Sequence, residues 1–193
     1  NFTTGLRNDG SLYTWGLNSS YQLGDGTSTN RSSPTKIGTA AWSVVAAGQA
    51  HTCGIQVDGT LWCWGSNSSG RLGDGTTTTR TTPVKIGAST NWVQVANGYT
   101  ATCGVRGNGT LWCWGNNGYG QVGDGTLTSR NAPVQVGSDT DWEMASLGRY
   151  HSCARKTNGE VYCWGRNNVG QIGTTDACAS GTFVCQTSPT QVR

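Results

Sequence analysis

The sequence predicts an all-β fold made of repeated units. The hydrophobic fraction is only 34%, and 30 glycines and nine tryptophans accompany two phenylalanines and one methionine. This composition favours many tight turns, with large indole side chains filling the space between them. The dipeptide Trp-Gly recurs at intervals of 49, 50 and 50 residues, at Trp15, Trp64, Trp114 and Trp164. The chain therefore contains four copies of one unit.

Each unit reads as four short strands, which are clearest in the second copy. Turns rich in Gly, Asn, Asp and Ser separate them. The predicted strands are 42–48, 51–57, 61–66 and 83–86. Short strands without the apolar period of a helix predict a four-stranded antiparallel sheet for each unit, and sheets repeated about an axis form a β-propeller. The predicted repeats of this single propeller segment are approximately 1–41, 42–91, 92–141 and 142–193.

The first repeat lacks its first strand. The segment "WSVVAAG" of the second copy has no counterpart before Asn1, so the chain holds four copies of the later three strands and three of the first. Two interpretations stay open. The sequence is a piece of a longer chain, or the incomplete sheet takes a strand from a neighbouring chain, since an open sheet edge invites pairing. We therefore expect part of a larger ring or assembly.

The order of the motifs resembles that of a known family. Gly-x-x-His-Thr/Ser-Cys precedes Asp/Asn-Gly, Trp-Gly, Gly-Gln-Leu-Gly-Asp-Gly-Thr and Arg-x-x-Pro, as in "YQLGDGTSTNRSSP" and "QVGDGTLTSRNAP". This order is similar to that of the regulator of chromosome condensation repeat family, here of a secreted, disulfide-containing type. The resemblance covers essentially the whole chain. It implies a propeller, commonly of seven blades, that serves as a rigid platform for proteins.

Most of the cysteines occur in pairs ten residues apart on either side of a predicted hairpin. If residues 57–59 form a three-residue loop with Gly59 in the left-handed conformation, counting outward places Cys53 opposite Cys63. This pair is of the non-hydrogen-bonded type, with Cα atoms about 4.5 Å apart and within reach of a disulfide. A two-residue turn would instead place Cys53 opposite Trp64, so the prediction depends on the turn type.

The same arithmetic applies to two further repeats, and the first repeat has threonine at both positions. The further predicted pairs are Cys103 with Cys113 and Cys153 with Cys163, and the threonines are Thr4 and Thr14. Zinc is disfavoured as an alternative, because its cysteine ligands are usually two to four residues apart and the chain has only two histidines. A reactive thiol is disfavoured too, since three equivalent copies indicate an architectural role. We expect no metal and no cofactor.

Cys178 and Cys185 lie in an insertion of the fourth repeat, "TTDACASGTFVCQTSP". A fourth local disulfide is predicted there. Eight paired cysteines indicate an oxidising compartment, so the expected location is extracellular, periplasmic or at the cell surface.

Charge and hydropathy exclude two classes of partner. The net charge of +3 is spread over a chain in which 12% of the residues are charged, and it forms no basic stripe for nucleic acid. No apolar run approaches the ~20 residues that a membrane-spanning helix needs. We therefore expect neither nucleic-acid binding nor membrane insertion.

Candidate chemical groups have architectural interpretations. His51 and His151 share a repeat position that Ala101 fills in the third copy, which favours a structural hydrogen bond over catalysis. Each Gly-Asp-Gly-Thr turn places an aspartate six residues before an arginine, and an Asp-Arg pair across the loop is predicted. These pairs are Asp25 with Arg31, Asp74 with Arg80, and Asp124 with Arg130. A propeller places equivalent loops on one face, so the three arginines are also a candidate surface for an anionic or glycan partner.

The tryptophans are predicted to pack between neighbouring blades. Trp62 and Trp64 are two residues apart on one strand and therefore face the same side. A plant ultraviolet-B photoreceptor resembles this family, but its Gly-Trp-Arg-His-Thr segment corresponds here to "GQAHT", "GYTAT" and "GRYHS", which lack tryptophan. A photoreceptor is therefore disfavoured. Five Asn-x-Ser/Thr sequons are candidate glycosylation sites, at Asn1, Asn18, Asn30, Asn67 and Asn108.

These observations predict a non-enzymatic, extracytoplasmic propeller that binds protein or builds an assembly, through one loop face or through its open blade edge. No convergent set of acid, base and nucleophile appears in the sequence. A secreted enzyme inhibitor and a glycan-binding lectin remain as alternatives. Guanine nucleotide exchange, the activity of the family's namesake, is disfavoured because disulfides do not suit the nucleus or cytosol.

Overall fold

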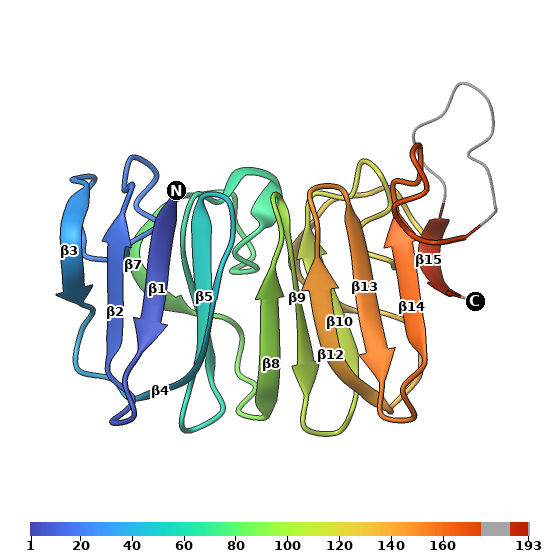
Figure 1. The fold of residues 1–193 in the computed structure, drawn as a ribbon, viewed down its shortest axis with the longest axis horizontal. Helices are drawn as coiled ribbons and strands as arrows, with labels where there is room; N and C mark the ends of the chain where they lie inside the picture. The colour runs from blue at the N-terminus through green and yellow to red at the C-terminus, as the bar shows by residue number, and fades with distance from the viewer. Residues whose placement is uncertain (175–185, 193) are drawn as a thin grey trace.

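The computed structural model describes residues 1–174 and 186–192, and these form four antiparallel sheets that follow one another along the longest axis (Figure 1). We call the sheets blades 1 to 4. Their orders are β1-β2-β3, β4-β5-β6-β7, β8-β9-β10-β11 and β12-β13-β14-β15. The predicted β-propeller architecture is confirmed. Blade 1 has three strands, as expected from the missing first segment.

The four strand positions recur with nearly constant lengths. First strands are β4 (Trp42–Ala47), β8 (Trp92–Asn97) and β12 (Trp142–Leu147). Second strands are β1 (Phe2–Leu6), β5 (His51–Gln56), β9 (Ala101–Arg106) and β13 (His151–Lys156). Third strands are β2 (Leu12–Gly16), β6 (Leu61–Gly65), β10 (Leu111–Gly115) and β14 (Val161–Gly165). Fourth strands are β3 (Arg31–Lys36), β7 (Arg80–Lys85), β11 (Arg130–Gln135) and β15 (Gln186–Gln191).

The fourth strand of blade 2 begins three residues earlier than the sequence predicted, at Arg80 instead of Pro83. The sequence-based prediction placed Pro83 at the first position of this strand. However, β7 is the edge strand of its sheet, and its pairing with β6 shifts register between Cys63 and Gly65. An edge strand with a bulge accepts proline in its interior.

The hairpins have the predicted turn and register. Gly59 has a φ of 77°, and the Gln56 amide donates to the Thr60 carbonyl oxygen at 2.9 Å. Cys53 consequently lies opposite Cys63, with Cα atoms 4.1 Å apart and the sulfurs bonded. Disulfides also join Cys103 to Cys113 and Cys153 to Cys163. Cys178 and Cys185 lie outside the described residues.

The core lies mainly between blades. Trp64 of blade 2 is fully buried, and its indole Nε1 donates to the Gln22 carbonyl oxygen of blade 1 at 3.0 Å. A Cβ atom at Gly24, whose φ is 76°, would lie 2.5 Å from that Nε1, so only glycine fits. Trp114 against Gly73 and Trp164 against Gly123 repeat the contact. Packing of these indoles between blades is therefore confirmed.

Helical structure in the described residues is limited to one short 3-10 turn, η1 (Ser68–Gly70). None of the described residues belongs to a helix with the length and hydropathy that a membrane crossing requires.

The disulfides are expected to stabilise the blades. Replacing Cys53 and Cys63 together by threonine reproduces the pair Thr4 and Thr14, which face each other in blade 1. We expect the free energy of unfolding to fall by ~2–3 kcal/mol, because the staple no longer restricts the unfolded chain. Urea denaturation measures this change.

Val57→Thr, at an exposed position in the same hairpin, is the matched control. We expect it to change the free energy of unfolding by less than about 0.5 kcal/mol. A double variant no less stable than this control would contradict a stabilising role for the disulfide.

Candidate functional site

One end of the blades carries the turns between first and second strands and the long loops that follow the third strands. Antiparallel alternation brings these segments to the same end, which is the upper end in Figure 1. We call this end the loop face. Its turns are 48–50, 98–100 and 148–150, and its loops are 17–30, 66–79 and 116–129.

Each of these three loops is closed by an aspartate and an arginine. In blade 2, Asp74 Oδ2 accepts a hydrogen bond from Arg80 Nε at 2.6 Å. Asp74 Oδ1 accepts from the Thr76 amide and hydroxyl at 3.0 and 2.7 Å. Burial opposes ionisation of Asp74, but the hydrogen bonds from Thr76 and Arg80 outweigh it, so the pKa lies below its ordinary value.

The predicted Asp-Arg pairs are thereby confirmed in all three loops. Arg31 reaches Asp25 and Arg130 reaches Asp124, each at 2.6 Å. Every one of these arginines has a neutralising carboxylate, and its side chain is about one third exposed, at 34–35%. Their use as a surface for an anionic or glycan partner stays a prediction.

A buried asparagine organises each loop from inside. Asn67 is fully buried, and its Nδ2 donates to Asp74 Oδ1 at 3.0 Å while its Oδ1 accepts from the Leu72 amide at 2.9 Å. The fully buried Asn18 makes the same contacts in blade 1. Neither amide nitrogen is available to carry a glycan in the folded chain, which corrects the prediction for these two sequons. Asn1, Asn30 and Asn108 are exposed, and their glycosylation stays a prediction.

The sequence held a signal for this asparagine. It recurs two residues after every Trp-Gly dipeptide, at Asn18, Asn67, Asn117 and Asn167. Only two of these four asparagines also begin a sequon, so the constant position is more informative than the sequon. The repeat alignment therefore identifies the residue as structural.

His51 is an architectural residue, as expected. It is fully buried, and its Nε2 lies 2.9 Å from the Thr102 hydroxyl of the neighbouring blade. Burial, and then the positive charge of Arg71, lowers the pKa of His51 to about 3. The imidazole is therefore neutral at pH 7. Half-buried His151 also has a lowered pKa because of desolvation.

The most distinctive group on the loop face was missed by sequence reasoning. Arg149 lies 4.8 Å from the ring centre of Tyr99 and 5.0 Å from that of Tyr150. Arg166 lies 5.2 Å from the ring centre of Tyr119 and 5.5 Å from that of Tyr150, and these two rings are 4.7 Å apart. We call these five residues the tyrosine–arginine cluster.

Arg149 is the exposed member of this cluster, whereas the tyrosines and Arg166 are partly buried. Among the described residues, no carboxylate lies within ion-pairing distance of Arg149. Arg149 lies in the segment "GRYHS", which aligns with "GYTAT" of the preceding repeat. Two tyrosines and an arginine in these adjacent turns were the available signal.

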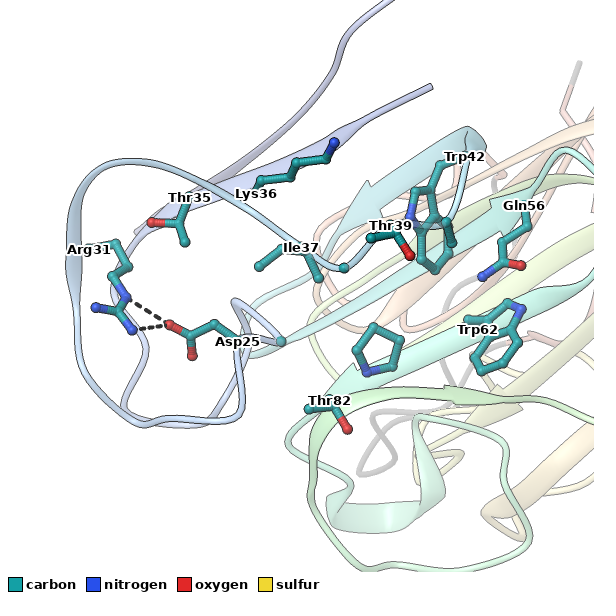
Figure 2. Close-up of a pocket in the computed structure, with 14 residues that line it drawn as sticks. Asp25, Arg31, Thr35, Lys36, Ile37, Thr39, Trp42, Gln56, Trp62 and Thr82 are labelled. Carbon is teal, nitrogen blue, oxygen red and sulfur yellow. Dashed lines mark hydrogen bonds and ion pairs between the residues drawn. The ribbon is translucent and has the colours of Figure 1, made fainter. Parts of the chain in front are cut away.

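A groove of about 620 Å³ runs between blades 1 and 2 (Figure 2). The Asp25–Arg31 pair lies at one end, and Trp42, Gln56 and Trp62 lie at the other. Across the described part of the chain, no three His, Cys, Asp or Glu side chains are grouped so that they could hold a metal ion.

Comparison with known proteins identifies the repeats. The model for the regulator of chromosome condensation (RCC1) repeat matches residues 9–55, 58–105 and 108–155, which is more than half of the chain. The chain belongs to this family. A second model of the RCC1 repeat matches residues 42–71, 92–121 and 145–171. A search of curated proteins found no match.

Solved RCC1-like structures share the fold. Human WBSCR16 is 26% identical with a TM-score of 0.85, and the match covers 100% of this chain and 51% of that one. Yeast Prp20p is 20% identical with a TM-score of 0.86, covering 100% and 48%. Yeast RCC1 (Prp20) bound to Kap60 is 20% identical with a TM-score of 0.83, covering 100% and 47%. The chain thus spans about half the length of these RCC1 propellers.

The Asp-Arg pairs predict a pH-dependent stability. Asp74→Asn weakens the charge-assisted bond from Arg80, so we expect the free energy of unfolding at pH 7 to fall by about 1.5–3 kcal/mol. The native pKa of Asp74 lies below its ordinary 3.8, so its contribution is present above pH 3.8 and is lost as the pH falls through the native pKa. The difference from wild type should therefore shrink toward pH 2.

Urea denaturation between pH 7 and pH 2 measures this difference. Glu143→Gln is the control, because the Glu143–Arg155 pair is exposed and should contribute little. A difference between wild type and Asp74→Asn that stays constant over this pH range would contradict the prediction.

Proposed function

We propose that this RCC1-repeat chain is a non-enzymatic interaction module of an oxidising, extracytoplasmic compartment, and that it binds a partner protein through the tyrosine–arginine cluster. One observation carries the proposal: exposed Arg149 is held between Tyr99 and Tyr150 with no carboxylate in ion-pairing distance among the described residues. Tyrosine and arginine are enriched where interfaces gain most of their affinity.

The geometry suits a binding contact in two ways. Stacking on the tyrosine rings restricts the guanidinium of Arg149, so less side-chain freedom is lost when a partner docks. The same guanidinium keeps its hydrogen-bond donors available for a carboxylate, which arginine binds in a bidentate manner. An acidic partner surface therefore matches this cluster.

The cysteines support the proposed compartment. Three disulfides in one short chain favour an extracellular, periplasmic or cell-surface location, and they disfavour a partner in the cytosol or nucleus. Guanine nucleotide exchange is disfavoured for the same reason. The Kap60 complex of yeast RCC1 (Prp20), and the binding of Prp20p to Gsp1p and histones, support the use of such a propeller as a protein platform.

Assembly through the open edge of blade 1 is a second candidate function. In the described residues, β1 pairs with β2 on one side and with no strand on the other. In the other blades this place is taken by β4, β8 or β12. An added strand would complete the sheet. Light scattering tests this candidate, and a monodisperse particle of 20.3 kDa would exclude it.

Arg149→Ala tests the proposed interface. Partners are captured by cross-linking in the extracytoplasmic fraction of the source cells, purified, and measured by biolayer interferometry. We expect the variant to bind at least tenfold more weakly, because a stacked arginine at the centre of an interface dominates affinity. Arg155→Ala is the control, since Arg155 is also exposed but is paired with Glu143, and we expect less than a twofold change.

Equal affinity of wild type and Arg149→Ala would contradict the proposed interface. Loss of binding after removal of glycans from the partner would indicate a lectin, and inhibition across a panel of secreted hydrolases would indicate an enzyme inhibitor. Free thiols at the three described cysteine pairs, found by non-reducing mass spectrometry, would contradict the compartment.

A further inference from the structure

The residue at the end of the second strand, or directly after it in blade 1, lies at an aromatic ring of the third strand. In three blades this residue is a cation that stacks on the ring. Arg7 lies 4.4 Å from the ring centre of Tyr13, Arg106 lies 3.9 Å from that of Trp112, and Lys156 lies 5.2 Å from that of Tyr162. Blade 2 has Gln56 and Trp62 at these positions.

In blades 3 and 4 the same cation also contacts the tryptophan that begins the first strand. Arg106 lies 4.7 Å from a ring centre of Trp92, and Lys156 lies 5.2 Å from that of Trp142. Two aromatic side chains of one blade thus contact one positive charge of the same blade. Attraction between a cation and the faces of aromatic rings explains this arrangement.

Blade 2 keeps both aromatic residues but lacks the cation. Trp42 pairs with Gln56 in the same register as Trp92 with Arg106 and Trp142 with Lys156. The Trp62 indole is fixed by donating to the Thr60 hydroxyl at 2.8 Å, as the Trp112 indole is by donating to the Thr110 hydroxyl at 2.9 Å. Blade 2 therefore has both aromatic residues in place but supplies no cation of its own to them.

The groove between blades 1 and 2 opens at this place. Trp42, Gln56 and Trp62 line it together (Figure 2), and the Gln56 carboxamide makes no hydrogen bond to another described residue. Its oxygen can accept a hydrogen bond from an ammonium or guanidinium group. The site thus offers the partly exposed ring of Trp62 and one amide acceptor, with the buried ring of Trp42 in its lining.

The groove is also lined by two cationic side chains, but neither occupies the place that Arg106 takes in blade 3. Arg31 is paired with Asp25 at 2.6 Å, and Lys36, at the end of β3, makes no cation–π contact with Trp42 or Trp62 within the described part of the chain. A lysine at that strand position is compatible with a bound cation in the next blade, because Lys85 ends β7 as Lys36 ends β3, and Arg106 still contacts Trp92 and Trp112.

We propose that the groove at Trp42, Gln56 and Trp62 binds the side-chain cation of a lysine or arginine from a partner protein. The partner supplies to blade 2 the charge that Arg106 and Lys156 supply to blades 3 and 4. The choice of a protein as the source of the cation rests on the interaction module proposed above, but the site is separate from the tyrosine–arginine cluster. A partner engaging both sites would present acidic and basic residues at different places.

A titration followed by ¹⁵N NMR tests the site directly. The signals measured are the indole N–H resonances of the whole, disulfide-bonded chain. The probes are the capped tripeptides Gly-Lys-Gly and Gly-Arg-Gly, with Gly-norleucine-Gly as the uncharged control. We expect saturable shifts of the Trp62 Nε1–H resonance with at least one charged probe and no shift of the Trp112 resonance. Absence of a response to both charged probes, or an equal response to norleucine, would overturn the proposal.

Two reciprocal variants sharpen the test. Gln56→Arg supplies the charge internally, so it should abolish the response of Trp62. Arg106→Gln empties the equivalent place in blade 3, so the Trp112 resonance should begin to respond. A Gln56→Arg variant that folds and still responds would contradict the site. If that variant fails to fold, an Arg106→Gln variant whose Trp112 stays silent would contradict it instead.

The titration is independent of the loop-face proposal. Arg149→Ala should leave the response of Trp62 unchanged, because no residue of the tyrosine–arginine cluster lines the groove. Failure of the loop-face interface would therefore leave this result intact, and a silent Trp62 would leave the loop-face test intact.

Discussion

The contact between a tryptophan of one blade and a glycine of the preceding blade is the constraint on which the rest of the structure depends. The Trp64 indole occupies the space that a side chain at Gly24 would need, and it also donates to the Gln22 carbonyl oxygen. Separate four-stranded sheets of this size have little core of their own. Burying an indole between each pair of blades therefore supplies both the core and the rotation from one blade to the next.

The same loop that accepts this indole also closes the loop face. Gly73 receives Trp114 of blade 3, and the next residue, Asp74, binds Arg80 of its own blade. One Gly-Asp dipeptide thus joins neighbouring blades and fixes the loop backbone. Because the loops are held from both sides, the exposed groups between them keep fixed positions. This rigidity makes the tyrosine–arginine cluster a preorganised surface.

Local geometry explains what the sequence could predict. Hairpin register follows from turn type, so Gly59 was sufficient to place Cys53 opposite Cys63. Contacts between blades depend on how strands about 50 residues apart meet, and the stacking of Arg149 on Tyr99 is of this kind. The sequons at Asn18 and Asn67 were misinterpreted because a short motif was considered without the buried network around its asparagine.

A comparison of the four repeats distinguishes residues that carry the fold from residues that carry function. Positions that are the same in every copy, such as the tryptophan of Trp-Gly and the asparagine three residues after that tryptophan, carry the fold. A position that changes while its surroundings stay the same indicates a role in function instead. At Gln56 the charge is lost, but both aromatic rings and the register are kept. If packing alone had selected those rings, the groove would be expected to fill with an apolar side chain. A groove that keeps both aromatic residues, with the Trp62 ring partly exposed to solvent, is better explained by binding of an outside partner.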